Sequence, residues 1–194
     1  MEQHDLFGVG ERPKGDLPEG FDYRSELISP AEEAELLAHI RDLPFRAFEF
    51  HGYSGNRRVI SFGWKYDFER RRLESAAEVP EFLLPLRAAA ARFARIEEDR
   101  LQQALVSEYD AGAGIGWHRD KVVFGEVVGV SLLAPCTFRL RRRVGEKWER
   151  RNVIAEPRSA YLLSGPARTE WEHSIPPVDT LRYSVTFRNL EAAG

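Results

Sequence analysis

The chain has 194 residues, 43% hydrophobic and 30% charged with a net charge of −3, a composition typical of a globular domain with one substantial core. No stretch approaches the roughly 18 apolar residues of a membrane span, the polar N-terminus lacks the apolar segment of a signal peptide, and a single cysteine, Cys136, excludes an intramolecular disulfide and a cysteine-based zinc cluster. We therefore expect a cytoplasmic monomer with no membrane association.

Two helices are predicted in the first hundred residues. Up to about Gly20 the chain is rich in glycine and proline, which indicates an irregular segment. Ser29-Pro30-Ala31-Glu32 is a capping box with proline at the first helical position, and apolar residues follow it at helical spacing. A second helix is predicted over residues 81–97, with Pro85 near its start, where proline is tolerated.

From Leu101 onward the pattern changes to short, alternating, β-branched segments separated by glycine and proline. The predicted strands cover residues 104–109, 126–133, 137–142, 160–163 and 181–188. Strands this short and numerous, without intervening helices, favour an antiparallel sandwich or open barrel. We predict an α+β fold in one domain, residues 1–194. A double-stranded β-helix (jelly-roll) core over residues 101–190 carries helices on its outside, and a smaller mixed region over residues 1–100 precedes it.

His118 and Asp120 form the strongest candidate for a metal site. Side chains two apart in an extended segment lie on the same face, so this pair can bind one ion. Of the other histidines, His173 lies in a predicted strand, whereas the remaining three lie in a tail, a helix and a loop: His4, His39 and His51. Two histidines and one carboxylate form the facial triad of non-haem iron(II) oxygenases. The pair is also compatible with ordinary hydrogen-bonded polar residues, and a zinc hydrolase uses similar ligands.

The last predicted strand has two distinct faces. One carries Arg182, Ser184, Thr186 and Arg188, whereas the other is apolar. Guanidinium groups bind carboxylates through two parallel hydrogen bonds, so the polar face suits a small dicarboxylate. The alternative interpretation is an exposed polar face opposite a core face.

These motifs resemble the AlkB-like 2-oxoglutarate/iron dioxygenases. The similarity covers residues 101–190 well and the first hundred residues loosely. The residues that carry it are Tyr109 and Gly112 in SEYDAGAGIGWHRDK, His118, Asp120, His173, and the run RYSVTFR from Arg182 to Arg188. The combination is specific, because the wider oxygenase superfamily shares the triad but not the paired arginines.

The resemblance implies a function and a ligand set. Fe(II) would be held by His118, Asp120 and His173. 2-Oxoglutarate would be bound by Arg182 through its distal carboxylate and by Tyr109, with Ser184 and Arg188 beside it. With O2, such an enzyme would demethylate N-alkylated bases in DNA or RNA and release formaldehyde, succinate and CO2.

The resemblance also implies how a nucleic acid would be recognised. In the family a segment before the core covers the active site; here that substrate-binding lid would consist of Phe62, Trp64, Lys65 and Tyr66, whose rings can stack on a flipped-out base. The alternation of these aromatic residues is equally compatible with a strand packed in the core.

A basic segment, residues 139–151, holds seven basic and two acidic residues. It is predicted to form a hairpin whose Arg142 and Arg143 contact the phosphate backbone. A charged hairpin that prevents pairing of sheet edges is the alternative.

Two positions depart from the family pattern. Val122 stands where repair enzymes usually carry an acidic residue near the base, and Ser107 stands where asparagine is common beside the cosubstrate. Two alternatives to a nucleic-acid demethylase therefore remain: a hydroxylase or demethylase of a protein or small molecule with the same chemistry, and a non-catalytic binding module that retains the fold.

Overall fold

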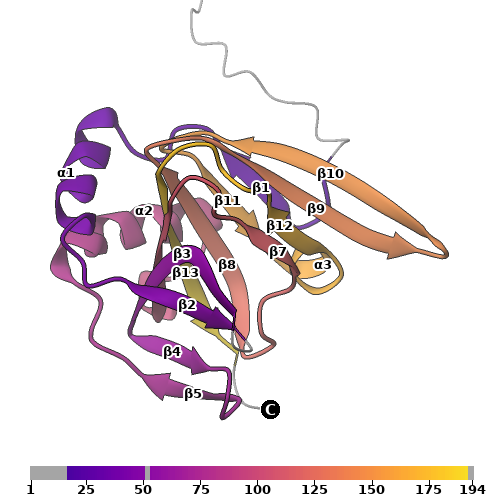
Figure 1. Ribbon diagram of the computed structural model, residues 1–194, viewed down its shortest axis with the longest axis horizontal. Helices are drawn as coiled ribbons and strands as arrows, with labels where there is room; N and C mark the ends of the chain where they lie inside the picture. The colour runs from indigo at the N-terminus through magenta and orange to yellow at the C-terminus, as the bar shows by residue number, and fades with distance from the viewer. Residues whose placement is uncertain (1–16, 51–52, 192–194) are drawn as a thin grey trace, which may run out of the picture.

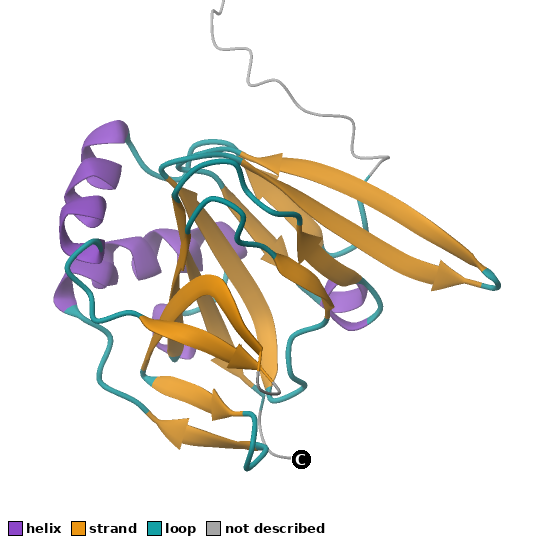
Figure 2. Ribbon diagram, in the orientation of Figure 1, coloured by secondary structure: helices purple, strands orange, loops and turns teal. Residues whose placement is uncertain are grey.

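The computed structural model describes residues 17–50 and 53–191, which form two larger antiparallel sheets and a small two-stranded one, with the two longer helices on one side of the molecule (Figures 1 and 2). The helical segments are α1 (Pro30–Ile40), the 3-10 turn η1 (Glu81–Leu83), α2 (Leu84–Ala94), a second 3-10 turn η2 (Glu98–Arg100) and α3 (Gly165–Thr169). Among the described residues, no helix is long and apolar enough to cross a membrane.

The larger sheet has seven strands in the order β1-β11-β8-β13-β6-β3-β2. Their bounds are β1 (Phe21–Arg24), β2 (Arg46–Phe50), β3 (Tyr53–Phe62), β6 (Gln103–Tyr109), β8 (Phe124–Leu132), β11 (Ala160–Leu163) and β13 (Arg182–Leu190). Strands from the first hundred residues therefore pair into the same sheet as strands from residues 101–190.

The smaller sheet has four strands in the order β10-β9-β12-β7. Their bounds are β7 (Ile115–His118), β9 (Cys136–Val144), β10 (Lys147–Ala155) and β12 (Glu172–Ile175). The β9–β10 hairpin is the predicted basic segment, and it projects beyond the body of the molecule (Figure 1). A separate two-stranded hairpin, β4 (Trp64–Asp67) and β5 (Arg72–Ser75), lies beside β2 and β3 (Figure 1).

Two apolar cores follow from this layering. One lies between the large sheet and helices α1 and α2, and includes Ile40, Leu86 and Val185. The other lies between the two sheets and includes Phe138 of β9 and Trp171. Because side chains alternate between the two faces of β13, its apolar residues lie in the first core and its polar residues lie between the sheets. The arrangement confirms the predicted jelly-roll core with helices packed outside it.

The helices show where local sequence determines structure. The Ser29 side chain accepts a hydrogen bond from the backbone N–H of Glu32, and the Glu32 carboxylate accepts one from the Ser29 N–H, as the capping box predicts. The second helix is shorter than predicted, because its first turn is the 3-10 turn η1 and Arg95 ends it in the left-handed conformation with a φ of 60°. Pro85 consequently lies in the first turn of α2, where it breaks no helical hydrogen bond.

Candidate metal and carboxylate site

Backbone pairing brings the three candidate metal ligands together. His118 ends β7 and lies directly opposite His173 of β12 in the antiparallel ladder, with ring centroids 4.3 Å apart. Asp120 follows two residues after His118, and the candidate ligand atoms of all three side chains lie within 4.8 Å of one another. The local His-x-Asp spacing and one long-range strand pairing are therefore sufficient to assemble the triad.

The remaining polar contacts direct these ligand atoms toward a common point. The Nδ1 atom of His118 lies 2.9 Å from the Gly116 carbonyl oxygen, which leaves its Nε2 atom for other interactions. Asp120 Oδ1 accepts a hydrogen bond from Arg188 Nε at 2.9 Å and forms an ion pair with Arg188 Nη2 at 2.7 Å. Asp120 Oδ2 is buried, has no hydrogen-bond donor among the described residues, and lies 3.5 Å from His173 Nε2. A buried carboxylate oxygen without a donor, beside two imidazoles, fits a divalent metal ion.

Charge and burial keep the ligands in the protonation states that metal binding requires. Burial would raise the pKa of Asp120, but the nearby charges of Arg188 and His173 outweigh it and hold that pKa well below its usual range. Burial lowers the pKa of His173 to about 3, despite the opposing charge of Asp120. A carboxylate and a neutral imidazole are both ready to coordinate without losing a proton.

Arg188 and Arg168 form hydrogen bonds that hold the residues around the triad in place. Arg188 of β13 also donates from Nη1 to the Gln103 side chain at 2.9 Å, so its guanidinium is fixed from both sides. Arg168 of α3 is buried and donates to the backbone oxygens of Lys121 (2.7 Å), Phe124 (2.6 Å) and Gly125 (2.8 Å), which immobilises the loop after Asp120. Arg168 was not predicted, because nothing local in the sequence shows that α3 packs on this loop.

Arg182 occupies the other end of the polar face of β13. It is only 2% exposed, its Nη2 donates to the Ser131 hydroxyl at 2.9 Å, and its guanidinium carbon lies 4.5 Å from the centroid of the Tyr109 ring. Its Nε and Nη1 atoms are buried and have no acceptor among the described residues. Ser184 is buried two residues away and is paired in register with Ser131 and Ser107. A buried guanidinium with two unused donors fits a carboxylate ligand.

Tyr161 also lies between the two sheets, and the sequence did not identify it as a residue of the site. It is a partner of Gly129 in the β11–β8 ladder, and a Cβ atom on Gly129 would overlap the end of the Tyr161 ring. Burial raises the pKa of the Tyr161 hydroxyl, and the charges of Asp120 and Arg182 both reach it. Gly129 thus leaves room for a phenol between the two sheets.

The four predicted lid residues do not lie together, because Phe62 is buried in the core whereas Trp64, Lys65 and Tyr66 are not. The structure places Phe62 in the helix-side core at 6% exposure, because Gly63 adopts a φ of 71° and interrupts the alternation between β3 and β4. Trp64 is half-buried, and Lys65 is exposed and pairs with Glu74 at 3.4 Å.

Tyr66 belongs to an aromatic cluster that contacts Lys121, the residue after Asp120. Its ring meets that of Phe68 edge-on at 5.2 Å, and Phe68 meets Phe48 of β2 at 5.7 Å. The ammonium of Lys121, the residue after Asp120, lies 5.5 Å from the Tyr66 ring and 5.4 Å from the Phe68 ring. Phe48 and Phe68 were not among the predicted residues, although Phe68 continues the spacing of Trp64 and Tyr66.

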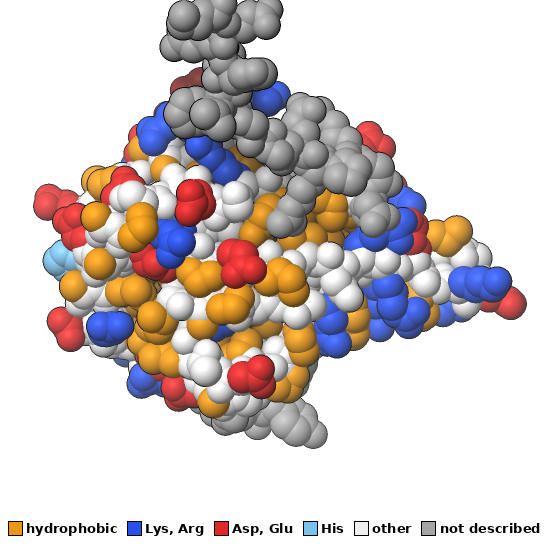
Figure 3. Space-filling view, turned by 90° about the horizontal axis from the view of Figure 1, so that it is seen from above, with side chains coloured by type: hydrophobic (Ala, Val, Ile, Leu, Met, Phe, Trp, Pro, Cys, Tyr) orange, Lys and Arg blue, Asp and Glu red, His pale blue; other side chains and the backbone are white. Residues whose placement is uncertain are grey.

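The basic hairpin is less strongly charged than its sequence indicates. Arg142 donates to Glu149 at 2.8 Å and to Glu170 at 3.0 Å, so two carboxylates neutralise it, whereas Arg143 is exposed near the turn. Arg141 pairs with Glu172 and its guanidinium carbon lies 4.4 Å from the Trp117 ring and 4.2 Å from the Trp148 ring. Lysine and arginine side chains nevertheless spread along the projecting end of the molecule (Figure 3).

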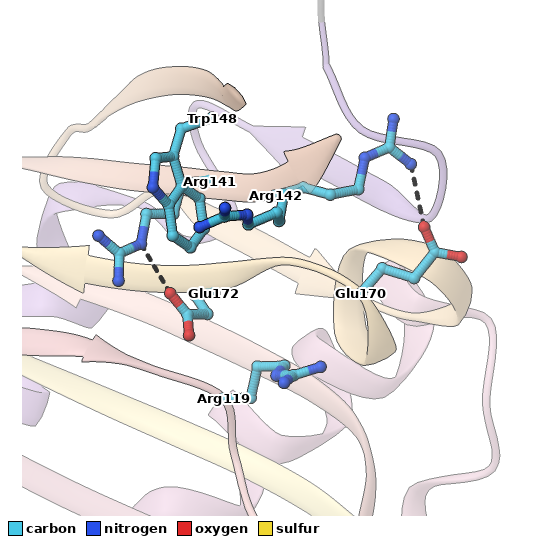
Figure 4. Close-up of a pocket in the computed structure, with 7 residues that line it drawn as sticks. Arg119, Arg141, Arg142, Trp148, Glu170 and Glu172 are labelled. Atoms are coloured by element: carbon cyan, nitrogen blue, oxygen red, sulfur yellow. Dashed lines mark hydrogen bonds and ion pairs between the residues drawn. The ribbon is translucent and has the colours of Figure 1, made fainter. Parts of the chain in front are cut away.

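A pocket of about 290 Å³ opens between this hairpin and the loop after β7 (Figure 4). Its lining is mainly basic and consists of Arg119, Arg141, Arg142, Arg143, Trp148, Glu170 and Glu172. Arg119 follows His118 directly and donates to the backbone oxygen of Thr169 at 2.9 Å. The pocket therefore places several guanidinium groups next to the loop that follows His118 and carries Asp120.

The chain is similar to a family model, to individual known proteins and to solved structures. Residues 23–188 match the family model of the 2OG-Fe(II) oxygenase superfamily. The chain is 29% identical over 175 residues to the Alkylated DNA repair protein ALKBH8 homolog of Arabidopsis thaliana, covering 78% of this chain and 49% of that protein, so it spans about half the length of this relative. It is 25% identical over 191 residues to the Uncharacterized protein L905 of Acanthamoeba polyphaga mimivirus, covering 88% of this chain and 85% of that protein.

Solved structures share the fold at low sequence identity. OsALKBH1 superimposes with a TM-score of 0.64 at 16% identity, covering 88% of this chain and 96% of that one. A prolyl hydroxylase from Trichoplax adhaerens superimposes with a TM-score of 0.61 at 14% identity, covering 88% and 83%. These likenesses establish the architecture and do not distinguish nucleic-acid from protein substrates.

Proposed function

The chain belongs to the 2OG-Fe(II) oxygenase superfamily, whose members use Fe(II), 2-oxoglutarate and O2, and from this premise we propose that it demethylates N-alkylated bases in DNA or RNA. The iron and cosubstrate chemistry of the proposal rests on two unsatisfied buried groups, Asp120 Oδ2 beside two imidazoles and the free donors of Arg182. The Asp120 oxygen fits a metal ion, and the Arg182 donors fit a carboxylate. The choice of a base as substrate rests on the aromatic cluster of Phe48, Tyr66 and Phe68.

His118, Asp120 and His173 would hold the iron. When bound, iron with 2-oxoglutarate and O2 supplies an oxidant that converts a C–H bond to C–OH. The chain's own contribution is to orient the ligands: the Gly116 carbonyl fixes the His118 ring and Arg188 fixes Asp120. These outer contacts limit the positions that the ligand atoms can adopt.

Arg182 would bind the distal carboxylate of 2-oxoglutarate. Its Nη2 is already fixed by Ser131 and its planar group rests on Tyr109, so the remaining donors are oriented before the cosubstrate arrives. Ser184 and the Tyr109 hydroxyl would complete the polar contacts. Burial between the two sheets excludes water from this end of the site.

The aromatic cluster of Phe48, Tyr66 and Phe68 would stack on the flipped-out base. The basic pocket beside the hairpin would accept a backbone phosphate. The bound iron and 2-oxoglutarate would supply the hydroxylation of an N-methyl group to N–CH2OH, with succinate and CO2 as co-products. Loss of formaldehyde would then leave N–H on the base.

The test measures succinate and formaldehyde with oligonucleotides that carry one methylated base, against the unmethylated sequence. We expect formaldehyde and succinate in equal amounts from the methylated oligonucleotide and neither above background from the control. Succinate production that no oligonucleotide stimulates, but that a peptide or small molecule does, would refute the proposal in favour of another substrate of the same chemistry.

A further inference from the structure

We infer that the site selects an uncharged base over a cationic one, because cations of the chain itself already lie over the aromatic cluster that would receive the base. The inference rests on the proposed function, since it concerns the charge of the substrate at the same site. It divides alkylated bases into two classes. 1-Methyladenine and 3-methylcytosine carry a positive charge at neutral pH, whereas N6-methyladenine carries none.

Lys121 is the first of these cations. Its ammonium lies 5.5 Å from the Tyr66 centroid and 5.4 Å from the Phe68 centroid, within the range of a cation–π contact. The fold fixes the backbone of Lys121, because its backbone oxygen accepts a hydrogen bond from the buried Arg168. Lys121 also directly follows Asp120, so its charge belongs to the loop that carries the triad.

Arg57 is the second cation. Its guanidinium carbon lies 4.2 Å from the centroid of the Phe48 ring, the third member of the aromatic cluster. Arg57 lies on β3 and is paired in register with Tyr109 on β6. Two cations therefore approach the cluster from different elements, one from the large sheet and one from the triad loop.

Most acidic groups of the β4–β5 hairpin are already paired with basic neighbours, and only Glu69 in its turn is exposed without an ion pair among the residues that the structure describes. Val122, next to Lys121 and 87% exposed, adds no charge. Glu74 pairs with Lys65 at 3.4 Å and with Arg72 at 3.1 Å, and Asp67 pairs with Arg70 at 3.6 Å.

These charges affect the two classes of base in opposite ways. A cationic base on the cluster would have to displace the exposed Lys121 side chain or remain near it, and like charges a few ångströms apart repel. A neutral base has an electron-rich face, so the same ammonium can lie over it. The cations then contribute to recognition of an uncharged base and oppose a charged one.

The test compares two oligonucleotides of identical sequence, one carrying 1-methyladenine and the other N6-methyladenine. Their dissociation constants are measured by fluorescence anisotropy with Mn(II)- and 2-oxoglutarate-loaded protein under oxygen-free conditions, in the wild type and in Lys121→Glu. We expect the wild type to bind the neutral base about tenfold more tightly or better, and Lys121→Glu to shift the ratio by at least about tenfold toward the cationic base.

The ratio is the informative quantity, because Lys121→Glu also weakens attraction to any phosphate backbone and this effect is common to both probes. Arg92→Glu is the matched control: it makes the same charge change on the exposed side of α2, on the helix side of the large sheet, and should leave the ratio unchanged.

Equal affinities in the wild type, a preference for 1-methyladenine, or a ratio that Lys121→Glu does not alter would overturn the inference. Formaldehyde release from either oligonucleotide would still support the proposed function in that case. Absence of formaldehyde from both would count against the demethylase function, while the measured binding ratio would still decide the charge preference.

Discussion

Replacing Arg182 by methionine should stabilise the protein without cosubstrate and should abolish the stabilisation that 2-oxoglutarate provides. The side chain is 2% exposed and two of its donors have no described acceptor. Each buried unsatisfied donor costs about 1–3 kcal/mol. The hydrogen bond to Ser131 and the contact with Tyr109, lost in the variant, offset about 1–2 kcal/mol of that gain. Methionine has a similar length and no donor, so the net gain is about 2 kcal/mol.

For a chain of this size, that gain raises the melting temperature by about 4–8 °C. In the wild type, 2-oxoglutarate at 100 times its dissociation constant adds about 2.7 kcal/mol. The assay is thermal unfolding with Mn(II), with and without 2-oxoglutarate. Arg182→Lys keeps the charge but loses the planar geometry, and should weaken cosubstrate binding by about tenfold or more. A methionine variant that melts below the wild type and still gains stability from 2-oxoglutarate would refute this reasoning.

Three further predictions concern the triad, the interior and the hairpin. His173→Ala should abolish turnover and reduce Mn(II) affinity in calorimetric titration without unfolding the protein, and unchanged affinity would remove His173 from the ligand set. Gly129→Ala should lower the free energy of unfolding by about 1–3 kcal/mol in urea titrations, because its new methyl group overlaps Tyr161; adding Tyr161→Leu should recover most of this loss, and no recovery would contradict the clash. Glutamine at three hairpin positions without a described ion pair should flatten the dependence of log K for oligonucleotides on log salt by about two to three units. These positions are Arg143, Lys147 and Arg150. An identical slope would leave the hairpin with only a structural role.

Features that depend on local spacing could be predicted from the sequence. The His-x-Asp pair, the capping box at Ser29 and the two faces of β13 all reflect periodicities within one segment, and the structure has each of them as expected. Phe62 shows the limit of this reasoning. It shares its alternation with Tyr66, but the positive φ of Gly63 separates the two, so that Phe62 packs in the core and Tyr66 packs against Phe68 outside it.

Features that depend on long-range pairing could not be predicted. The fit of Tyr161 against Gly129 requires the β11–β8 register, and the neutralisation of Arg142 by Glu170 joins positions 28 residues apart. The loop anchor Arg168 likewise contacts residues more than 40 positions away. In each case the residue type is ordinary for its local segment, and only the partner gives it a role.

The lysine and arginine side chains around the three metal-ligand candidates are consistent with a nucleic-acid substrate, in which a negatively charged backbone carries an uncharged modified base. Attraction to a phosphate backbone requires only that cations lie along its path, and the exposed hairpin and the pocket at Arg119 provide them. Selection of the base occurs at shorter range, where Lys121 and Arg57 lie over the aromatic rings. At that distance the two cations favour an uncharged base, and the exposed Val122 beside Lys121 adds no carboxylate that would offset them. The same local charges can therefore increase affinity for the strand and disfavour a charged lesion within it.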